Sequence, residues 1–129
     1  MSNRTLEQRR AAFALRQITS HADSSDYGNY AGRVKSFPAI ALANGLGQAL
    51  ASLLAKSDSD KGCKLLYEDL RLWMCEENEV SSPYFGTTDL LEALTNRSQD
   101  QYIQAQVELL GLSIWLKKFT QAYLSAEGD

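Results

Sequence analysis

The segment SQDQYIQAQVELLGLSIWLKKFTQAYLSA, residues 98–126, is the longest stretch of the chain with an uninterrupted helical pattern. It opens with Ser98-Gln99-Asp100-Gln101. This is a capping-box pattern, in which a serine hydroxyl and a glutamine side chain each satisfy a free backbone amide of the first turn. Gly111 is the only residue inside the segment that strongly disfavours a helix. We therefore predict one long C-terminal helix.

Apolar residues form two stripes on this helix instead of one. At about 100° per residue, one stripe contains Ile103, Val107, Leu110 and Ile114. The second stripe contains Ala105, Leu109, Leu112, Leu116, Phe119 and Tyr123. A narrow polar line of Gln106, Ser113 and Lys117 separates them. Because a helix with one stripe packs on one side only, two stripes predict neighbours on two sides and a central position in the domain.

The rest of the chain predicts an all-α fold. Its 129 residues form one domain, residues 1–129. No segment combines strict alternation with β-branched and aromatic residues, so we predict no strand. Further helices are expected over about residues 5–22, 27–37, 46–56, 61–77 and 88–96, giving a single-domain bundle of about five to six helices. Pro38 is expected to end the second of these at a corner, and Asn44-Gly45 resembles a helix C-cap.

The sequence offers no set of residues for catalysis or metal binding. Cys63 and Cys75 lie far apart in the chain, without the spacing of a zinc or redox site. The one histidine, His21, falls at a helix end, where we expect a surface residue or a helix-end cation. No metalloprotease, EF-hand, nucleophile-elbow or Walker A motif occurs. We expect no catalytic residues, no metal and no cofactor.

Location is also constrained by the sequence. The N-terminus lacks the apolar core of a signal peptide, and reduced cysteines fit the cytoplasm. Residues 36–55 carry no charge, but Pro38 and Asn44-Gly45 interrupt them and alanine dominates, which does not suit a membrane span. We expect a cytoplasmic protein with no membrane contact.

Charge is distributed unevenly along the chain. Residues 1–56 contain seven basic and three acidic residues, whereas residues 57–129 contain six basic and thirteen acidic ones. Such asymmetry indicates a partner for the basic part, such as a nucleic-acid backbone. It is equally compatible with complementary surfaces in a head-to-tail assembly.

The first helix places an aromatic ring between two cations. Arg9, Phe13 and Arg16 share a face at i, i+4 and i+7. This arrangement suits a ring that stacks on a base while guanidiniums hold phosphates. A core phenylalanine flanked by solvated arginines would give the same pattern, and the sequence alone leaves both interpretations open.

Three motifs together resemble a known family. The first is Tyr30-x7-Pro38-x6-Gly45-Leu46-x-Gln48-Ala49-Leu50-Ala51, the second is Ile114-Trp115-Leu116-Lys117-Lys118-Phe119 followed by Ala122 and Leu124, and the third is Arg9-Arg10-Ala11-Ala12-Phe13. In this order they resemble the small α-helical subunit of the type III-B CRISPR Cmr effector complex. The resemblance implies a non-enzymatic subunit that stacks in several copies, contacts other Cmr subunits, and lines the groove holding guide RNA and target RNA. RNA cleavage would then belong to other subunits.

Physical reasoning selects the candidate RNA contacts, because the resemblance supplies no compact signature for them. A guide RNA reads sequence by base pairing, so this subunit should contact phosphates. The candidates are Arg9, Arg10, Arg16, Arg33, Lys35, Lys117 and Lys118. The alternative function is a helical protein–protein adaptor or regulator without RNA, which would use the apolar face of the last helix or the region of Trp73, Tyr84 and Phe85. A small helical enzyme is disfavoured by the missing acid/base and metal groups.

Overall fold

A computed structural model describes the backbone of residues 4–128 and the side chains of residues 4–123. The helices are α1 (Leu6–His21), α2 (Tyr27–Asn44), α3 (Leu46–Ala55), α4 (Lys61–Leu72), α5 (Leu90–Asn96) and α6 (Gln99–Gly128). A π-helical turn, η1 (Trp73–Glu77), continues α4 directly. No strand occurs in this part of the chain, so the all-α prediction is confirmed.

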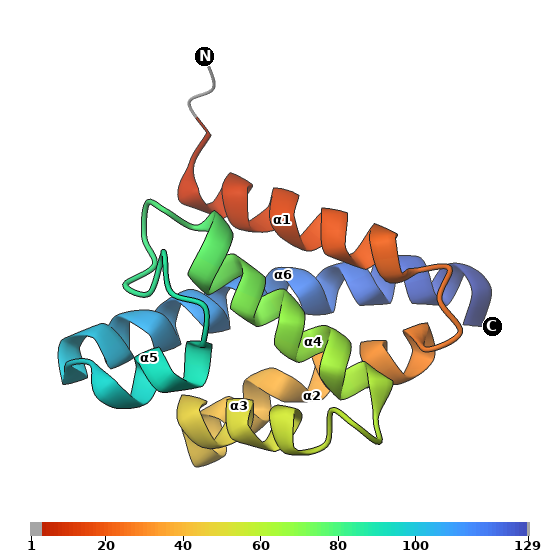
Figure 1. Cartoon of the computed structure of the whole chain (residues 1–129). Coiled ribbons are helices and arrows are strands. Elements are labelled where there is room, and N and C mark those ends of the chain that lie inside the picture. The colour runs from red at the N-terminus through yellow and green to blue at the C-terminus, as the bar shows by residue number, and fades with distance from the viewer. Residues whose placement is uncertain (1–3, 129) are drawn as a thin grey trace.

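The long helix α6 crosses the whole molecule behind the others (Figure 1). Helix α1 runs along its upper side, and α4 crosses in front. Helices α2 and α3 form the lower part, and α5 covers the first turns of α6. Helices α1, α2 and α5 all contact α6, and α4 packs on α2 and α3. The other helices therefore lie on one side of α6.

Local sequence signals explain several helix boundaries. The Thr5 hydroxyl accepts a hydrogen bond from the Gln8 amide at 3.1 Å, and the Gln8 side chain accepts one from the Thr5 amide at 2.8 Å. This is the expected capping box of α1. Between α2 and α3, Gly45 has φ 91° and donates its amide to the Ala41 carbonyl at 2.8 Å. A positive φ of this size favours glycine, so the predicted break at Asn44-Gly45 is confirmed.

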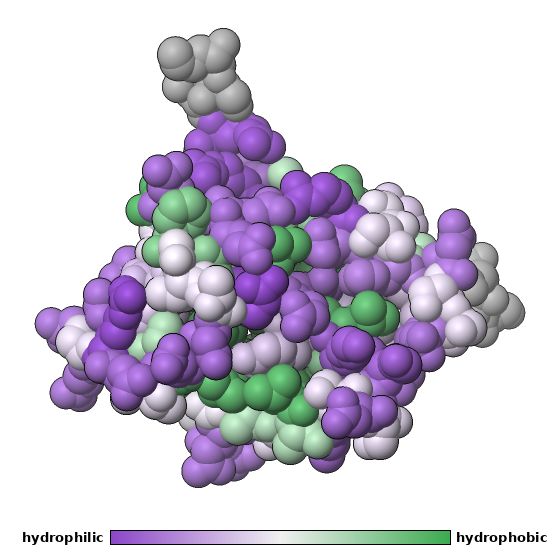
Figure 2. All heavy atoms as spheres, in the orientation of Figure 1, coloured by the Kyte–Doolittle hydropathy of each residue, from purple (hydrophilic) through white to green (hydrophobic). Residues whose placement is uncertain are grey.

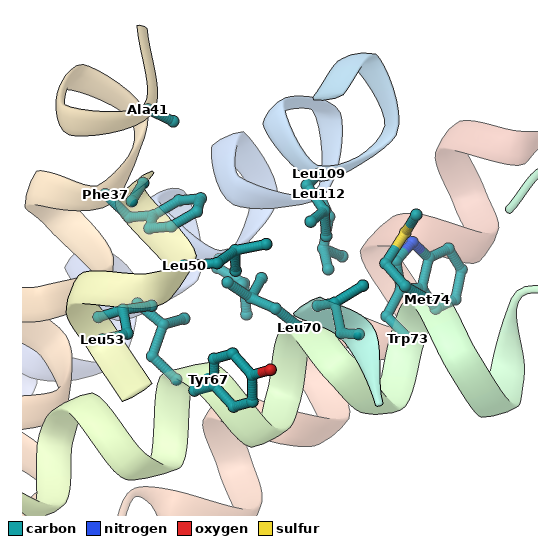
Figure 3. Packing of buried hydrophobic residues seen from close by; sticks show 14 of the residues in the cluster. Phe37, Ala41, Leu50, Leu53, Tyr67, Leu70, Trp73, Met74, Leu109 and Leu112 are labelled. Carbon is teal, nitrogen blue, oxygen red and sulfur yellow. The ribbon is translucent and has the colours of Figure 1, made fainter. Parts of the chain in front are cut away.

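The second apolar stripe of α6 forms the centre of the core. Ala105, Leu109, Leu112 and Leu116 are fully buried. Figure 3 shows Leu109 and Leu112 directed into the same apolar cluster as Met74 of η1. This stripe packs as the sequence predicts, whereas Tyr123 at its end is exposed.

Three of the four residues in the first apolar stripe of α6 remain exposed, whereas Leu110 is half-buried against the core. Ile103, Val107 and Ile114 are 52%, 62% and 57% exposed. The expectation that other helices of this chain cover both stripes is therefore wrong. The reason is the one-sided arrangement of Figure 1, in which α1, α2 and α5 lie on one side of α6 and leave most of the first stripe uncovered.

The expected corner at Pro38 is also wrong, because α2 continues through it to Asn44. A proline inside a helix removes one backbone hydrogen bond and costs about 3 kcal/mol or more. Phe37 and Ala41, on either side of the proline, are buried at 2% and 1%. Their packing holds the helix together across the proline. Among the residues described, no helix is long and apolar enough to span a bilayer.

Candidate RNA-contact and assembly surface

One of the seven candidate cations, Arg10, is part of a buried ion pair. Its Nε and NH2 atoms donate to the two carboxylate oxygens of Glu108 at 2.9 and 2.8 Å. Its NH1 atom donates to Glu7 at 2.7 Å. Arg10 is 9% exposed and Glu108 is 2% exposed. A guanidinium neutralised inside the protein cannot reach a phosphate, so we remove Arg10 from the candidate contacts.

Glu108 is the centre of a polar network that the sequence analysis missed. Besides Arg10, the Trp73 indole donates to it at 2.9 Å and the Ser81 hydroxyl at 3.0 Å. Burial alone would raise the pKa of Glu108, but these hydrogen bonds outweigh it and hold the pKa below the usual value. Gly111 makes room for the network, since a Cβ there would lie 2.9 Å from the Arg10 guanidinium carbon. In the sequence, the pattern that could have indicated this network is a charged residue, Glu108, next to the buried stripe of α6, followed one turn later by Gly111.

Arg16 pairs with an acid of the same chain. It bonds both carboxylate oxygens of Glu77 at 2.6 and 2.7 Å and lies 5.2 Å above the Phe13 ring centre. Phe13 is 2% exposed and packs on Trp73 with ring centres 4.9 Å apart. The base-stacking interpretation of Phe13 is therefore wrong, and the core interpretation is confirmed.

Arg33 is similarly engaged. Its Nε and NH2 atoms bond Asp60 at 3.1 and 2.7 Å. The pKa of Asp60 is lowered, first by its hydrogen bond from the Cys63 amide and then by Arg33. Asp60 also caps α4, so Arg33 helps to fix the start of that helix.

The other four candidates, Arg9, Lys35, Lys117 and Lys118, make no ion pair with the residues described. Lys117 and Lys118 line a surface pocket together with Pro38 of α2. Lys35 precedes Pro38 by one helical turn and is exposed. The structure therefore brings the second half of α6 and the middle of α2 to one surface, which we call the lysine surface (Lys35, Lys117 and Lys118). Arg9 lies on α1 and is half-buried.

The exposed stripe of α6 leads into the lysine surface. Residues 103, 107, 114 and 121 recur at helical spacing on one face, and Lys117 and Lys118 flank its end. Ile114 and Gln121 line the same pocket as the two lysines. One face of α6 thus combines aliphatic side chains with a pair of cations.

His21 lies in the last turn of α1, the expected helix end, but its side chain is only 16% exposed and is not a free surface residue. Its Nε2 atom lies 3.1 Å from Asp69, which also accepts hydrogen bonds from the Tyr30 hydroxyl at 2.6 Å and from Gln17 at 2.7 Å. Burial and then the Asp69 charge raise the pKa of Tyr30. These contacts join α1, α2 and α4 within the packed interior. No group of three or more metal-binding side chains occurs among the residues described.

The aromatic region proposed for an adaptor is mostly unavailable. Trp73 and Tyr84 are 3% and 0% exposed, and only Phe85 reaches the surface, at 42%. A partner could not insert between these rings without opening the core. The apolar face of α6 is the remaining surface of the adaptor hypothesis.

Comparison with known proteins identifies relatives of the chain. The family model described as "CRISPR-associated protein (Cas_Cmr5)" matches residues 6–123. The fold is similar to the X-ray crystal structure of a CRISPR-associated Cmr5 family protein from Thermus thermophilus, with a TM-score of 0.77 and 27% sequence identity. That match covers 95% of this chain and 99% of the Thermus chain.

Proposed function

Because the chain belongs to the Cmr5 family of CRISPR-associated proteins, we propose that it is a non-catalytic structural subunit of a type III-B Cmr ribonucleoprotein. In this proposal several copies stack in the cytoplasm beside other Cmr subunits, along the groove occupied by guide RNA and target RNA. The observation that carries the proposal is the face of α6 that joins the exposed stripe to the lysine surface.

The exposed stripe supports a role in assembly. Ile103, Val107 and Ile114 are each more than half exposed on one face of one helix. Aligned aliphatic side chains on a monomer mark a protein contact surface more often than isolated ones do. In the proposed complex a neighbouring subunit covers this face. It then provides the packing on the second side of α6 that the two apolar stripes of the sequence predict.

The lysine surface supports contact with RNA phosphates. A lysine ammonium is a flexible point charge, suited to phosphate contacts that hold an RNA backbone without reading bases. Lys35, Lys117 and Lys118 are exposed and lack acidic partners among the residues described. Arg9 is a fourth candidate at a separate position on α1. With a net charge of −3, the chain contributes a local and modest share of RNA affinity.

RNA retention in the assembled complex tests this proposal. The tagged chain would be recovered from its native host, and bound proteins and RNA would be measured over a range of salt concentrations. A Lys117→Glu/Lys118→Glu variant should retain less RNA while recovering the same subunits. Losing two phosphate contacts should reduce the salt slope by about 2. The matched control is Lys61→Glu/Lys64→Glu, which makes the same charge change at exposed positions of α4.

Assembly is tested separately with Val107→Asp, which places a charge in the exposed stripe. It should lower the recovery of the other subunits, whereas Leu54→Asp, at a 43% exposed position of α3, should not. Recovery of one protein partner without RNA would contradict the proposal and favour the adaptor function. RNA retention that does not change in the lysine variants would contradict the phosphate-contact part alone.

A further inference from the structure

A small pocket opens at the start of α4, between α2 and α3. Its volume is about 60 Å3. Buried apolar side chains form its walls, among them Phe37, Leu53 and Cys63. Since about 10–15 Å3 suffices for one water-sized group, the pocket has room for about four such groups, enough for the three carbons of an isopropyl group. Figure 2 shows apolar side chains gathered over α3 in the lower part of the view.

Cations border this apolar pocket. Lys56 is exposed, lines the pocket and makes no ion pair with the residues described. Arg33 lines it as well, although Asp60 already neutralises that guanidinium. The pocket therefore suits an aliphatic side chain with a carboxylate beside it.

The chain itself carries such a group in the turn after η1. Val80 is 69% exposed, and its neighbour Glu79 is exposed and makes no ion pair within the described part of the chain. The two acids before it differ, since Glu76 pairs with Arg71 and Glu77 with Arg16. We call Glu79-Val80 the acidic tip.

The acidic tip is held in a fixed position. The Asn78 side chain accepts the Ser81 amide at 3.0 Å, and Asn78 is fully buried. The Ser81 hydroxyl donates to buried Glu108 at 3.0 Å, and the Gln104 side chain donates to the Ser81 carbonyl at 2.8 Å. A tip anchored on both sides loses little freedom when it docks, and such preorganisation favours binding.

The pocket and the acidic tip lie at opposite ends of one rod, the continuous helix formed by α4 and η1. Lys61 begins α4 beside the pocket, and Glu77 ends η1 just before the tip. At 1.5 Å per residue these ends are about 25 Å apart. Figure 1 shows this rod crossing the front of the molecule, with the loop after η1 at its far end. The tip of one molecule cannot reach its own pocket.

We propose that the acidic tip of one copy docks in the pocket of the next, with Val80 in the apolar cavity and Glu79 against Lys56. The proposal rests on the proposed function and identifies the surfaces through which copies would stack. Because the two surfaces differ, the contact is heterologous and repeats into an open row instead of closing into a dimer. Lys56 belongs to the basic first part of the chain and Glu79 to the acidic second part.

Charge reversal with rescue tests the pairing. Copies per complex would be counted by native mass spectrometry, and self-association of the isolated chain would be measured by sedimentation. Lys56→Glu and Glu79→Lys should each weaken self-association by about tenfold and reduce the copies to one, because like charges then face each other. The double variant Lys56→Glu/Glu79→Lys should recover both the self-association and the copy number, because opposite charges face each other again. An equal mixture of the two single variants should also self-associate, because each tip then meets a pocket of opposite charge. Lys64→Glu and Glu92→Lys are the matched controls at exposed positions outside the pocket and tip.

The outcomes separate this contact from the proposed function. Single variants that keep the wild-type copy number, or a double variant that fails to recover it, overturn the contact while leaving a Cmr subunit in place. A wild-type chain that joins no complex refutes the proposed function, and sedimentation then decides the contact alone. A wild-type chain that joins no complex and stays monomeric at about 1 mM, where even an association with a millimolar Kd would be detected, overturns both the contact and the proposed function.

Discussion

Replacing Glu108 with glutamine tests how far the fold depends on one buried carboxylate. One of its oxygens accepts Arg10 Nε and the Trp73 indole, each at 2.9 Å. The other accepts Arg10 NH2 at 2.8 Å and the Ser81 hydroxyl at 3.0 Å. Glutamine has the same size, but it replaces one acceptor oxygen with an NH2 group and removes the charge. Two donors then face another donor, and Arg10 loses its buried counter-ion.

The expected loss is large. Breaking a buried ion pair by removing one partner costs about 3–5 kcal/mol, and a domain of this size has a total stability of about 5–15 kcal/mol. Glu7→Gln is the matched control, because Glu7 bonds the same guanidinium at 2.7 Å but has a side chain that is 61% exposed. An exposed pair contributes only about 0–1 kcal/mol.

Urea unfolding followed by far-ultraviolet circular dichroism measures both variants. The free energy of unfolding should fall by at least about 3 kcal/mol for Glu108→Gln and by less than about 1 kcal/mol for Glu7→Gln. The double variant Arg10→Met/Glu108→Leu should recover much of the loss, since no unpaired charge stays buried. Equal small losses in Glu108→Gln and Glu7→Gln would refute the reasoning.

Three further predictions concern pH, packing and thiol reactivity. The pKa of Glu108 is held below its ordinary 4.5, so the carboxylate stabilises the fold above that pH, and this stabilisation is lost as the pH falls through the folded-state pKa. When unfolding is measured over an acid pH series, the free energy of unfolding should therefore fall less steeply with decreasing pH in Glu108→Gln than in the wild type. Gly62→Ala should lower the melting temperature, because its Cβ would lie 2.7 Å from the backbone of α2. Gly32→Ala, where a Cβ would have nothing within 4 Å, should leave the melting temperature unchanged or raise it by removing a helix-disfavouring glycine. Equal melting temperatures of the two variants would contradict this. Burial raises the pKa of Cys63 and of Cys75, so both thiols should react with a chromogenic disulfide only after unfolding, and rapid reaction of the native protein would be the contrary result.

The helix boundaries follow from local chemistry, which is why the sequence predicts them well. The Thr5 capping box and the break at Gly45 each depend on residues within one turn of the boundary. The predicted end of α2 at Pro38 is wrong for the opposite reason. The proline costs one local hydrogen bond, and burial of its neighbours against other helices outweighs that cost. Such long-range packing cannot be read from a proline and its flanking residues.

The candidate site is predictable only in part, because a cation's availability depends on distant acids. Arg10 and Glu108 are 98 positions apart in sequence. Near Arg10 only Glu7, three positions earlier, distinguishes it from Arg9, which makes no ion pair with the residues described, and Glu7 gives no sign of the buried partner Glu108. Periodicity identifies the face of α6 that contains Lys117, but it cannot show which of two apolar stripes the rest of the chain covers.

The charge asymmetry along the sequence acquires a different meaning in three dimensions. Three cations of the basic first part, Arg10, Arg16 and Arg33, pair with acids of the acidic second part. The excess of basic residues in the first part of the chain therefore holds α1 and α2 against the later helices. This excess is weak evidence for an RNA partner. What remains for partners is a smaller set of unpaired charges, with the lysine surface at one place and Lys56 at another. Because Arg10, Arg16 and Arg33 are paired inside the chain, RNA affinity should respond to substitutions in the lysine surface and change little with the total charge of the chain.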